Sequence, residues 1–202
     1  MKKVFLLLFI FSFNSYSQFL DAELSFIGGT SKIGIARINI LNDKIIFRTN
    51  KDSKKEKYNH KQISKLVLKK DSISNTYRYK KTLGRRAPKL LQVIKEDKNL
   101  SLYAVVTESN FLYSYGLIGA LATTLVDANK INYEYYIVKS NNLKASFMGS
   151  TEYTSRKRLR EIIKKRLKDC SQLLKKSENK EFKAKDIPMI VDFYNLNCNR
   201  NQ

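Results

Sequence analysis

Short segments in which apolar and polar residues alternate predict that most of the chain is β-strand. The clearest is Lys89–Glu108, where two runs rich in Leu, Val, Ile and Tyr flank a polar cluster at residues 96–99. A polar cluster between two such runs is typical of a tight connection, so the pair is predicted to form an antiparallel hairpin. An isolated hairpin is only marginally stable in water, so this one requires neighbouring strands. Alternation places Leu91 and Val93 on one face, with Leu100, Leu102 and Ala104 alternating opposite them.

Further strand-like segments precede and follow this hairpin. They cover residues 33–40, 44–48, 63–68, 76–81, 133–139 and 143–147. The stretch before them, residues 19–32, has no clear pattern apart from a bend expected at Gly28-Gly29. Asn42-Asp43 and Asn141-Asn142 are short connections between strands. Because no helix long enough for a crossover separates these segments, we predict an antiparallel meander or small barrel of about eight strands.

The period of the apolar residues becomes helical in residues 151–202. Leu173 and Leu174 continue the face of a first helix, and Asp186 is placed to cap a second one. These helices are predicted to pack on the sheet. The fold class is therefore α+β, mainly β, with an antiparallel β domain at 18–150 and a C-terminal helical pair that forms a cap at 151–202. The apolar stripes are Leu159, Ile162, Ile163 and Leu167 in the first helix, and Ile187, Ile190, Val191 and Tyr194 in the second.

Residues 1–17 have the pattern of a cleaved secretory signal peptide. Lys2 and Lys3 precede the apolar segment Val4–Phe13, and small residues at 15 and 17 place the cleavage site before Gln18. The apolar segment is shorter than the roughly 20 residues that a spanning helix needs. We therefore expect an exported protein that is periplasmic, associated with the outer membrane, or secreted.

Export changes the interpretation of the two cysteines. Cys170 and Cys198 are the only pair in the chain, and they flank the second predicted helix. An oxidising compartment permits a disulfide between them, and we predict that bridge. The alternative is two free thiols, each buried as a small apolar group.

The chain is strongly basic, with a formal net charge of +21 from 39 Lys and Arg against 18 Asp and Glu. Such an excess indicates an anionic environment or partner, unless the lysines serve only solubility. It is concentrated in the first predicted helix, where Glu161 is the one acidic residue. Basic residues in a first turn oppose the helix dipole, so this charge does not serve helix stability. The basic residues are Arg156, Lys157, Arg158, Arg160, Lys164, Lys165, Arg166 and Lys168.

This helix is amphipathic, which is typical of helices that meet anionic surfaces. We expect its apolar side to pack on the sheet and its basic side to face an anionic lipid or polysaccharide. The alternative is a basic side that is only solvated.

An uncharged segment interrupts the β domain as an insertion at about 110–128. No charged residue occurs between Glu108 and Asp127. Three roles stay open: an apolar loop or short helix that plugs the core, a surface loop that contacts a membrane or a protein partner, and a spanning helix. The candidate residues are Phe111, Leu112, Leu117, Ile118, Leu121 and Leu125.

Catalytic and cofactor motifs are missing from the sequence. It has no nucleophile elbow, paired-Cys zinc spacing, zinc-protease motif or phosphate-binding Gly loop. The one histidine, His60, is expected at the surface. Glu96 with Asp97 is explained by a turn, and Gly84-Arg85-Arg86 is a basic turn suited to anion contact. Export argues against nucleic acid as the partner, although Tyr-rich strands can stack bases. We expect no catalytic activity, no cofactor and no metal.

Several short motifs resemble a loose group of uncharacterised exported bacterial proteins. These have a signal peptide, an antiparallel β region that ends in Tyr-Tyr-x-Val-Lys, and a C-terminal helical pair around an Asp-Cys. The resemblance implies no activity. The matching residues are 135–139, Asp169-Cys170, 180–187 and 193–195.

Two functions follow as expectations. The first is a non-catalytic binding or scaffolding module at the bacterial envelope, with a basic face for an anionic surface. The alternative is a periplasmic carrier barrel for a small apolar ligand. A closed barrel with an open apolar interior favours the carrier, whereas a filled interior with an exposed basic face favours the envelope binder.

Overall fold

The strands of the chain form one curved sheet in the order β10-β9-β8-β7-β6-β5-β1-β2-β3-β4. The computed structural model describes residues 19–107, 132–140 and 142–198, and the statements below refer to these. The strands are β1 (Leu20–Phe26), β2 (Ser31–Asn39), β3 (Lys44–Arg48), β4 (Glu56–Tyr58), β5 (Ile63–Lys70), β6 (Ile73–Thr82), β7 (Lys89–Lys95), β8 (Leu100–Val106), β9 (Tyr133–Lys139) and β10 (Lys144–Ser150). Neighbours in this order pair antiparallel, which confirms the predicted mainly-β fold class.

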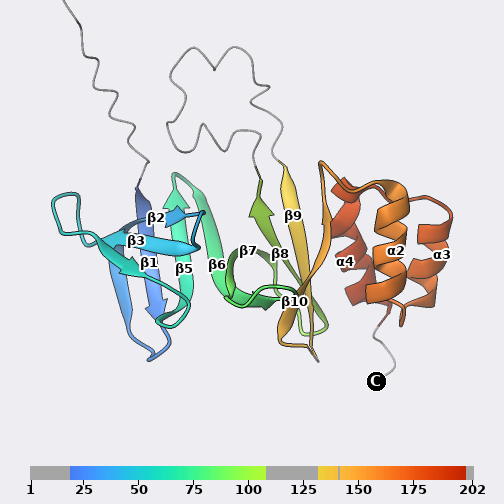
Figure 1. Cartoon of the computed structure of the whole chain (residues 1–202), viewed down its shortest axis with the longest axis horizontal. Coiled ribbons are helices and arrows are strands. Elements are labelled where there is room, and N and C mark those ends of the chain that lie inside the picture. The colour runs from blue at the N-terminus through green and yellow to red at the C-terminus, as the bar shows by residue number, and fades with distance from the viewer. Residues whose placement is uncertain (1–18, 108–131, 141, 199–202) are drawn as a thin grey trace, which may run out of the picture.

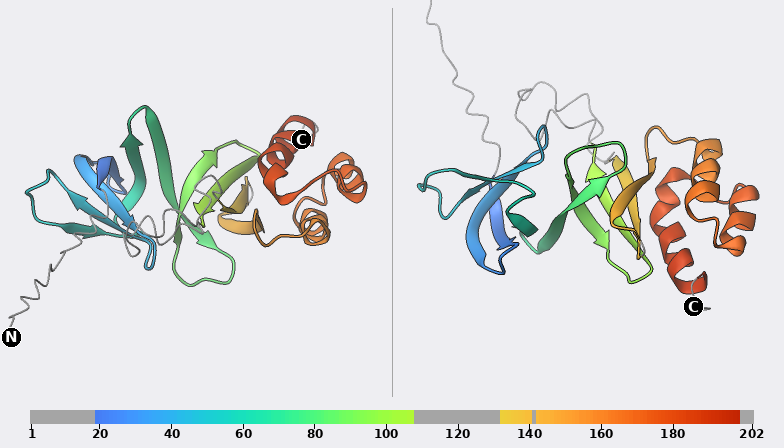
Figure 2. Two further views of the ribbon diagram at one scale, coloured as in Figure 1. Left: turned by 90° about the horizontal axis from the view of Figure 1, so that it is seen from above. Right: turned by 60° about the horizontal axis from the view of Figure 1, so that its bottom comes forward.

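A short parallel pairing closes part of the sheet. Lys144 and Ala145 of β10 pair with Lys81 and Thr82 of β6, so β6–β10 form a ring, the name used for them below. Figure 1 shows the ring between the N-terminal strands at one end of the molecule and the helices at the other. Both views in Figure 2 show the same arrangement along the long axis.

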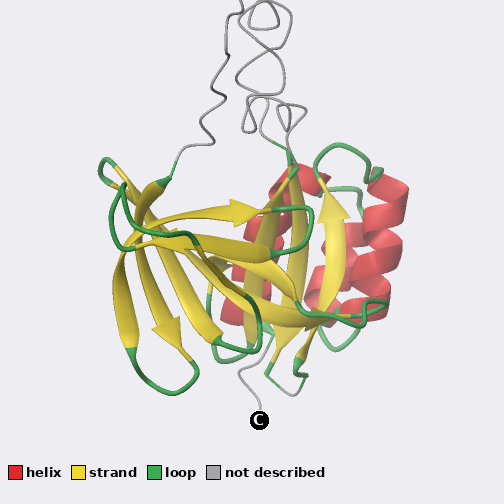
Figure 3. Cartoon of the chain, turned by 60° about the vertical axis from the view of Figure 1, so that its left-hand side comes forward, coloured by secondary structure: helices red, strands yellow, loops and turns green. Residues whose placement is uncertain are grey.

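Two strands were not expected from the sequence. β1 lies in the stretch 19–32, where only a bend was expected. Its buried residues Ala22 and Leu24 alternate with Asp21 and Glu23, as in a strand, but Asp and Glu have low strand propensity. β4 has three residues and pairs with β3. It lies at the end of the charged segment 50–57, which follows β3 in the chain. Both belong to the N-terminal part of the sheet, which curls toward the viewer on the left of Figure 3.

The central hairpin has the predicted strands, with Leu91 and Val93 in the ring interior and Leu100, Leu102 and Ala104 on the other face of the sheet. Val93 pairs with Tyr103, and Tyr103 pairs with Tyr136, so these side chains share the inner face of the ring. Leu102 pairs with Ile137 on the outer face. The residues that fill the ring are Leu91, Tyr103 and Ala145, with Val93, Val105, Tyr136 and Val138 packed against them. These side chains occupy the ring interior.

The helices cover the outer face of the ring. They are α2 (Arg156–Arg166), α3 (Ser171–Glu178), the short 3-10 helix η2 (Ala184–Asp186) and α4 (Ile187–Asn197). The outer sheet face contributes Leu100, Leu102, Ala104, Tyr135, Ile137 and Met148 to one core with the helices. The helices contribute Leu159, Ile162, Ile163, Leu167, Leu173, Ile187, Ile190, Val191 and Tyr194.

The helical cap differs from the predicted pair in two details. The first predicted helix is divided, because α2 ends at Arg166 and α3 begins at Ser171, with Cys170 at the N-cap of α3. Asp186 does not cap α4 through its side chain. Its carboxylate instead accepts a hydrogen bond from Lys183 N at 2.8 Å, which closes the η2 turn ahead of α4.

Candidate binding surfaces

The basic helix α2 is anchored by its apolar side. Ser155 caps it, since its hydroxyl oxygen accepts a hydrogen bond from Arg158 N at 3.2 Å. Leu159, Ile162 and Ile163 are buried, and α2 packs on β10 and α3. The residues at helical spacing therefore face the core, and the charged residues between them are left on the outside.

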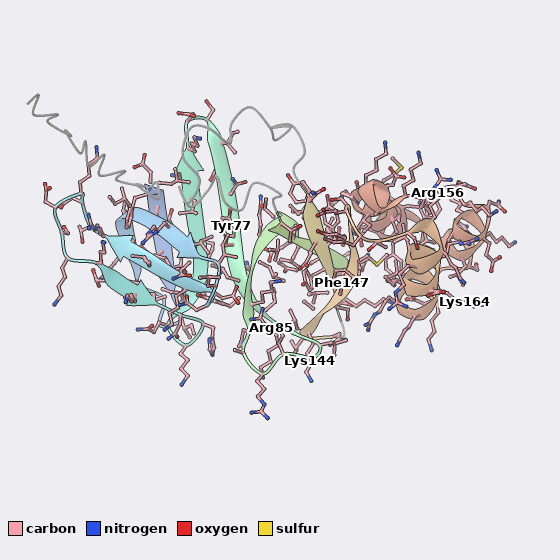
Figure 4. All side chains as sticks on the ribbon, turned by 45° about the horizontal axis from the view of Figure 1, so that its top comes forward. Tyr77, Arg85, Lys144, Phe147, Arg156 and Lys164 are labelled. Atoms are coloured by element: carbon pink, nitrogen blue, oxygen red, sulfur yellow. A yellow bond between two sulfur atoms is a disulfide. The ribbon has the colours of Figure 1, made fainter. Side chains whose placement is uncertain are left out.

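The outside of α2 carries nearly unopposed positive charge. Of its eight basic residues, counting Lys168 just beyond the helix, Arg160 and Arg166 are half-buried and the others are exposed. Arg158 pairs with Glu161 at 3.2 Å, and this is the one ion pair that α2 makes with described residues. In Figure 4, Arg156 and Lys164 point away from the body of the molecule. We call these eight residues the basic face; they are Arg156, Lys157, Arg158, Arg160, Lys164, Lys165, Arg166 and Lys168.

A disulfide fixes the end of this helix. Cys170 and Cys198 are bonded, with 5.1 Å between their Cα atoms, which confirms the bridge predicted from the sequence. Cys170 is buried in the junction between α2 and α3, and Cys198 ends α4. The bridge therefore joins the α2–α3 junction to the end of α4.

Asp169 makes a second link at the same junction. Its carboxylate accepts hydrogen bonds from Lys139 Nζ of β9 at 2.7 Å and from the Tyr194 hydroxyl of α4. Partial burial favours the neutral acid, but the hydrogen bonds from Lys139 and Tyr194 outweigh it and hold the pKa of Asp169 below its ordinary value. Burial, together with the hydrogen bond to Asp169, raises the pKa of Tyr194.

Asp169→Asn is expected to lower the free energy of unfolding at pH 7 by about 1 kcal/mol, because Lys139 loses its anionic acceptor at a partly exposed site. The folded pKa of Asp169 is depressed, so its contribution is present above the unfolded pKa and disappears as the pH falls through the folded pKa. The gap in the free energy of unfolding between the wild type and Asp169→Asn should therefore close in acid. Urea denaturation across the acidic range measures this gap. A gap that is independent of pH would contradict the assigned role.

A cleft of about 420 Å³ lies between the β2–β3 turn and the strands β6–β9. It bears on the carrier alternative, because its apolar wall includes Val105, which also packs in the ring interior. Its apolar lining comes from Ile38, Ile40, Tyr77, Leu90, Val105 and Val106.

The charged groups of this cleft are paired. Arg85 lies 3.3 Å from the Asp43 carboxylate, and Lys89 lies 3.2 Å from that of Glu134. Lys89 also donates to the Tyr136 hydroxyl at 3.3 Å. Burial raises the pKa of Tyr136, and the neighbouring Glu134 adds to the effect. The cleft therefore combines an apolar wall with charges that neutralise one another, which suits a small apolar molecule better than an ion.

Three other residues considered in the sequence have structural roles. His60 is half-buried, and its ring meets that of Tyr79 edge-on at 6.0 Å. Asp97 accepts a hydrogen bond from Asn99 N at 2.9 Å, as expected for a turn. Glu96 does more than the predicted turn requires, since it pairs with Arg78 at 3.0 Å and accepts a hydrogen bond from the Tyr103 hydroxyl at 2.9 Å.

The apolar-loop candidates in the uncharged segment lie outside the described residues. Pairing continues to the edge of that segment, because Val106 pairs with Tyr133 and Thr107 N donates to Asn132 O at 2.8 Å. The candidates concerned are Phe111, Leu112, Leu117, Ile118, Leu121 and Leu125.

The cleft and the pairing around it were not foreseen from the sequence. Lys89 and Glu134 are 45 positions apart and carry no shared motif, so only the pairing of the strands brings them together.

Two features are absent from residues 19–107, 132–140 and 142–198. These ranges hold no helix that is both long and apolar enough to cross a membrane, and no group of three or more metal-ligating His, Cys, Asp or Glu side chains. Comparison of the chain with protein-family models, with curated proteins and with solved structures found no match.

Proposed function

We propose that this protein is an exported, non-catalytic binding module of the bacterial envelope, in which the basic face of α2 contacts an anionic lipid or polysaccharide surface. The observation that supports it is the division of α2 into a buried apolar side and an exposed basic side with one carboxylate. The apolar side already satisfies the packing of the helix. The basic side is therefore available to a partner.

The spacing of the cations adds to this proposal. Arg156, Arg160 and Lys164 follow one another at four-residue intervals within α2, and Lys168 continues the row just beyond the helix. Side chains at this spacing are neighbours on a helix, and like charges there destabilise it by a few tenths of a kcal/mol per pair. No acidic residue lies in the first turn to offset the dipole. An anionic surface would relieve both effects.

Salt dependence tests this function. Binding to vesicles of phosphatidylcholine with phosphatidylglycerol, or to lipopolysaccharide, is expected to weaken steeply as salt is raised, because exposed charges are screened beyond a Debye length of about 8 Å at physiological ionic strength. Co-sedimentation across a salt series measures it, with pure phosphatidylcholine vesicles as the uncharged control. Binding that is independent of salt, or no binding to either anionic surface, would contradict the proposal.

The cleft supports a second candidate, a carrier of a small apolar ligand. Its volume of about 420 Å³ and its paired charges match the usual size and character of small-molecule sites. Saturable one-to-one binding of the apolar fluorophore N-phenyl-1-naphthylamine, unaffected by salt, would favour the carrier. Unsaturable partitioning of the fluorophore would count against it.

A further inference from the structure

Two turns that are far apart in the sequence meet at one end of the ring. Leu83 N, in the β6–β7 turn, donates a hydrogen bond to Ala145 O, next to the β9–β10 turn, at 3.2 Å. The parallel pairing of Lys144 with Lys81 joins the same two segments. We call residues 81–86 and 142–145 together the turn pair.

Each turn of the pair exposes a leucine. Leu143 is 89% exposed, more than any other large apolar side chain in the described part of the chain, and Leu83 is 48% exposed. A single exposed leucine is common on protein surfaces. Two of them on turns that are hydrogen-bonded to each other give this end of the ring two apolar side chains that the fold leaves in solvent.

Cations lie beside these leucines. Lys81, Arg85, Arg86 and Lys144 line a shallow pocket of about 390 Å³ between the two turns, and no carboxylate lines it. Arg85 pairs with Asp43 at 3.3 Å, whereas the other three form no ion pair with any described residue. Figure 4 shows Arg85 and Lys144 close together at this end of the ring, well away from Arg156 and Lys164.

A buried polar group adds to the pocket. Thr82, which also lines it, is 5% exposed, and its hydroxyl oxygen has no hydrogen-bond partner among the described residues. Buried polar groups are normally hydrogen-bonded, so this hydroxyl is an unsatisfied group beside the pocket.

We propose that the turn pair docks on an anionic lipid bilayer, with Leu83 and Leu143 entering the acyl region and the pocket cations binding lipid phosphate. Long basic side chains beside an apolar tip can reach the headgroups while the tip lies deeper. A polysaccharide or a free phosphate would leave the leucines in water, so the two features together select lipid. The inference rests on the proposed function for the anionic nature of the surface, and it adds a second contact and the class of partner.

The chain contains no tryptophan, so Leu143→Trp introduces a single emission reporter. With vesicles of phosphatidylcholine and phosphatidylglycerol, its emission should shift to shorter wavelength and be quenched by lipid brominated in the acyl chains. Glycerol phosphate in solution should produce neither change, which separates lipid from free phosphate. The matched control is Ile73→Trp, at the opposite end of β6 and 66% exposed, which should not respond.

The double variant Leu83→Ser with Leu143→Ser is expected to bind these vesicles roughly 100-fold more weakly, about tenfold for each leucine withdrawn from the acyl region. Both side chains are exposed, so the thermal unfolding midpoint should hardly change. Unaltered vesicle affinity in the double variant would overturn the inference.

The inference and the proposed function fail in different ways. If vesicles bind but the Leu143→Trp emission stays unshifted and unquenched, the turn pair does not enter the bilayer, and the basic face of α2 can still carry the binding. If neutralising α2 leaves vesicle binding intact while Leu143→Trp responds, the turn pair is the membrane contact and the proposed role of α2 is wrong. If anionic vesicles do not bind the wild-type protein, the inference is overturned, and the proposed function is overturned with it if lipopolysaccharide does not bind either.

Discussion

Replacing Cys170 and Cys198 with Ser is expected to lower the free energy of unfolding by about 3.5 kcal/mol. The two cysteines are 28 positions apart, and the chain-entropy relation gives a cost of this size, about 3.5 kcal/mol, for releasing such a loop in the unfolded state. The variant can be compared with the wild type by urea denaturation without reductant. Wild type with reductant is the matched control, because it should unfold at nearly the same urea concentration as the variant.

The effect should be largest in the helical cap. The bridge joins the α2–α3 junction to the end of α4, and Asp169 links that junction to β9 and to Tyr194. Hydrogen exchange should therefore speed up in α2–α4 more than in β1–β5, which forms a separate core around Leu24, Phe47 and Leu66. Equal unfolding midpoints for the wild type and the variant would show that the bridge does not hold the cap.

Neutralising four lysines of the basic face should reduce binding to anionic vesicles by roughly 1000-fold, since each cation near such a surface contributes about 1 kcal/mol. The substitutions are Lys157→Gln, Lys164→Gln, Lys165→Gln and Lys168→Gln, all at exposed positions. Loss of Lys164 and Lys165 from the last turn removes favourable interactions with the helix dipole, so circular dichroism and thermal unfolding must accompany the binding titration. A folded variant that keeps its affinity would contradict the role of α2.

Most of the sheet could be predicted because its strands show local alternation. β7 and β8 are the best case, with two apolar runs around a polar turn, and the structure places both strands as expected. Which residues pair across the hairpin was less accessible. The register irregularity between Val93 and Lys95 sets the pairing across the hairpin, and alternation within one strand does not specify such a shift.

The basic face of α2 could be predicted because the sides of a helix follow from spacing alone. Leu159, Ile162 and Ile163 define the buried side, and the charged residues between them must lie on the other. The end of this helix was less clear, because Leu173 continues the apolar stripe into α3. The break between α2 and α3 lies at Asp169 and Cys170, whose partners Lys139, Tyr194 and Cys198 are distant in the sequence.

The turn pair and the cleft could not be predicted, because each depends on contacts between distant segments. The sequence indicates a basic turn at Gly84-Arg85-Arg86, but nothing in it places Lys144 or Leu143 beside that turn. The closure of the ring through β10 and β6 creates that surface. Contacts of this kind depend on the tertiary pairing of strands, and local patterns carry no information about it.

The most direct test of α2 compares two variants that lose the same charge at different places. One carries the four lysine substitutions in the basic face. The other carries Lys51→Gln, Lys54→Gln, Lys55→Gln and Lys61→Gln, all at exposed positions around β4 at the other end of the molecule. Their dissociation constants for phosphatidylcholine–phosphatidylglycerol vesicles should differ by at least about 100-fold if α2 lies against the surface, because a charge more than a Debye length away contributes little. Equal losses in the two variants would show that net charge alone drives binding and that α2 is not the contact.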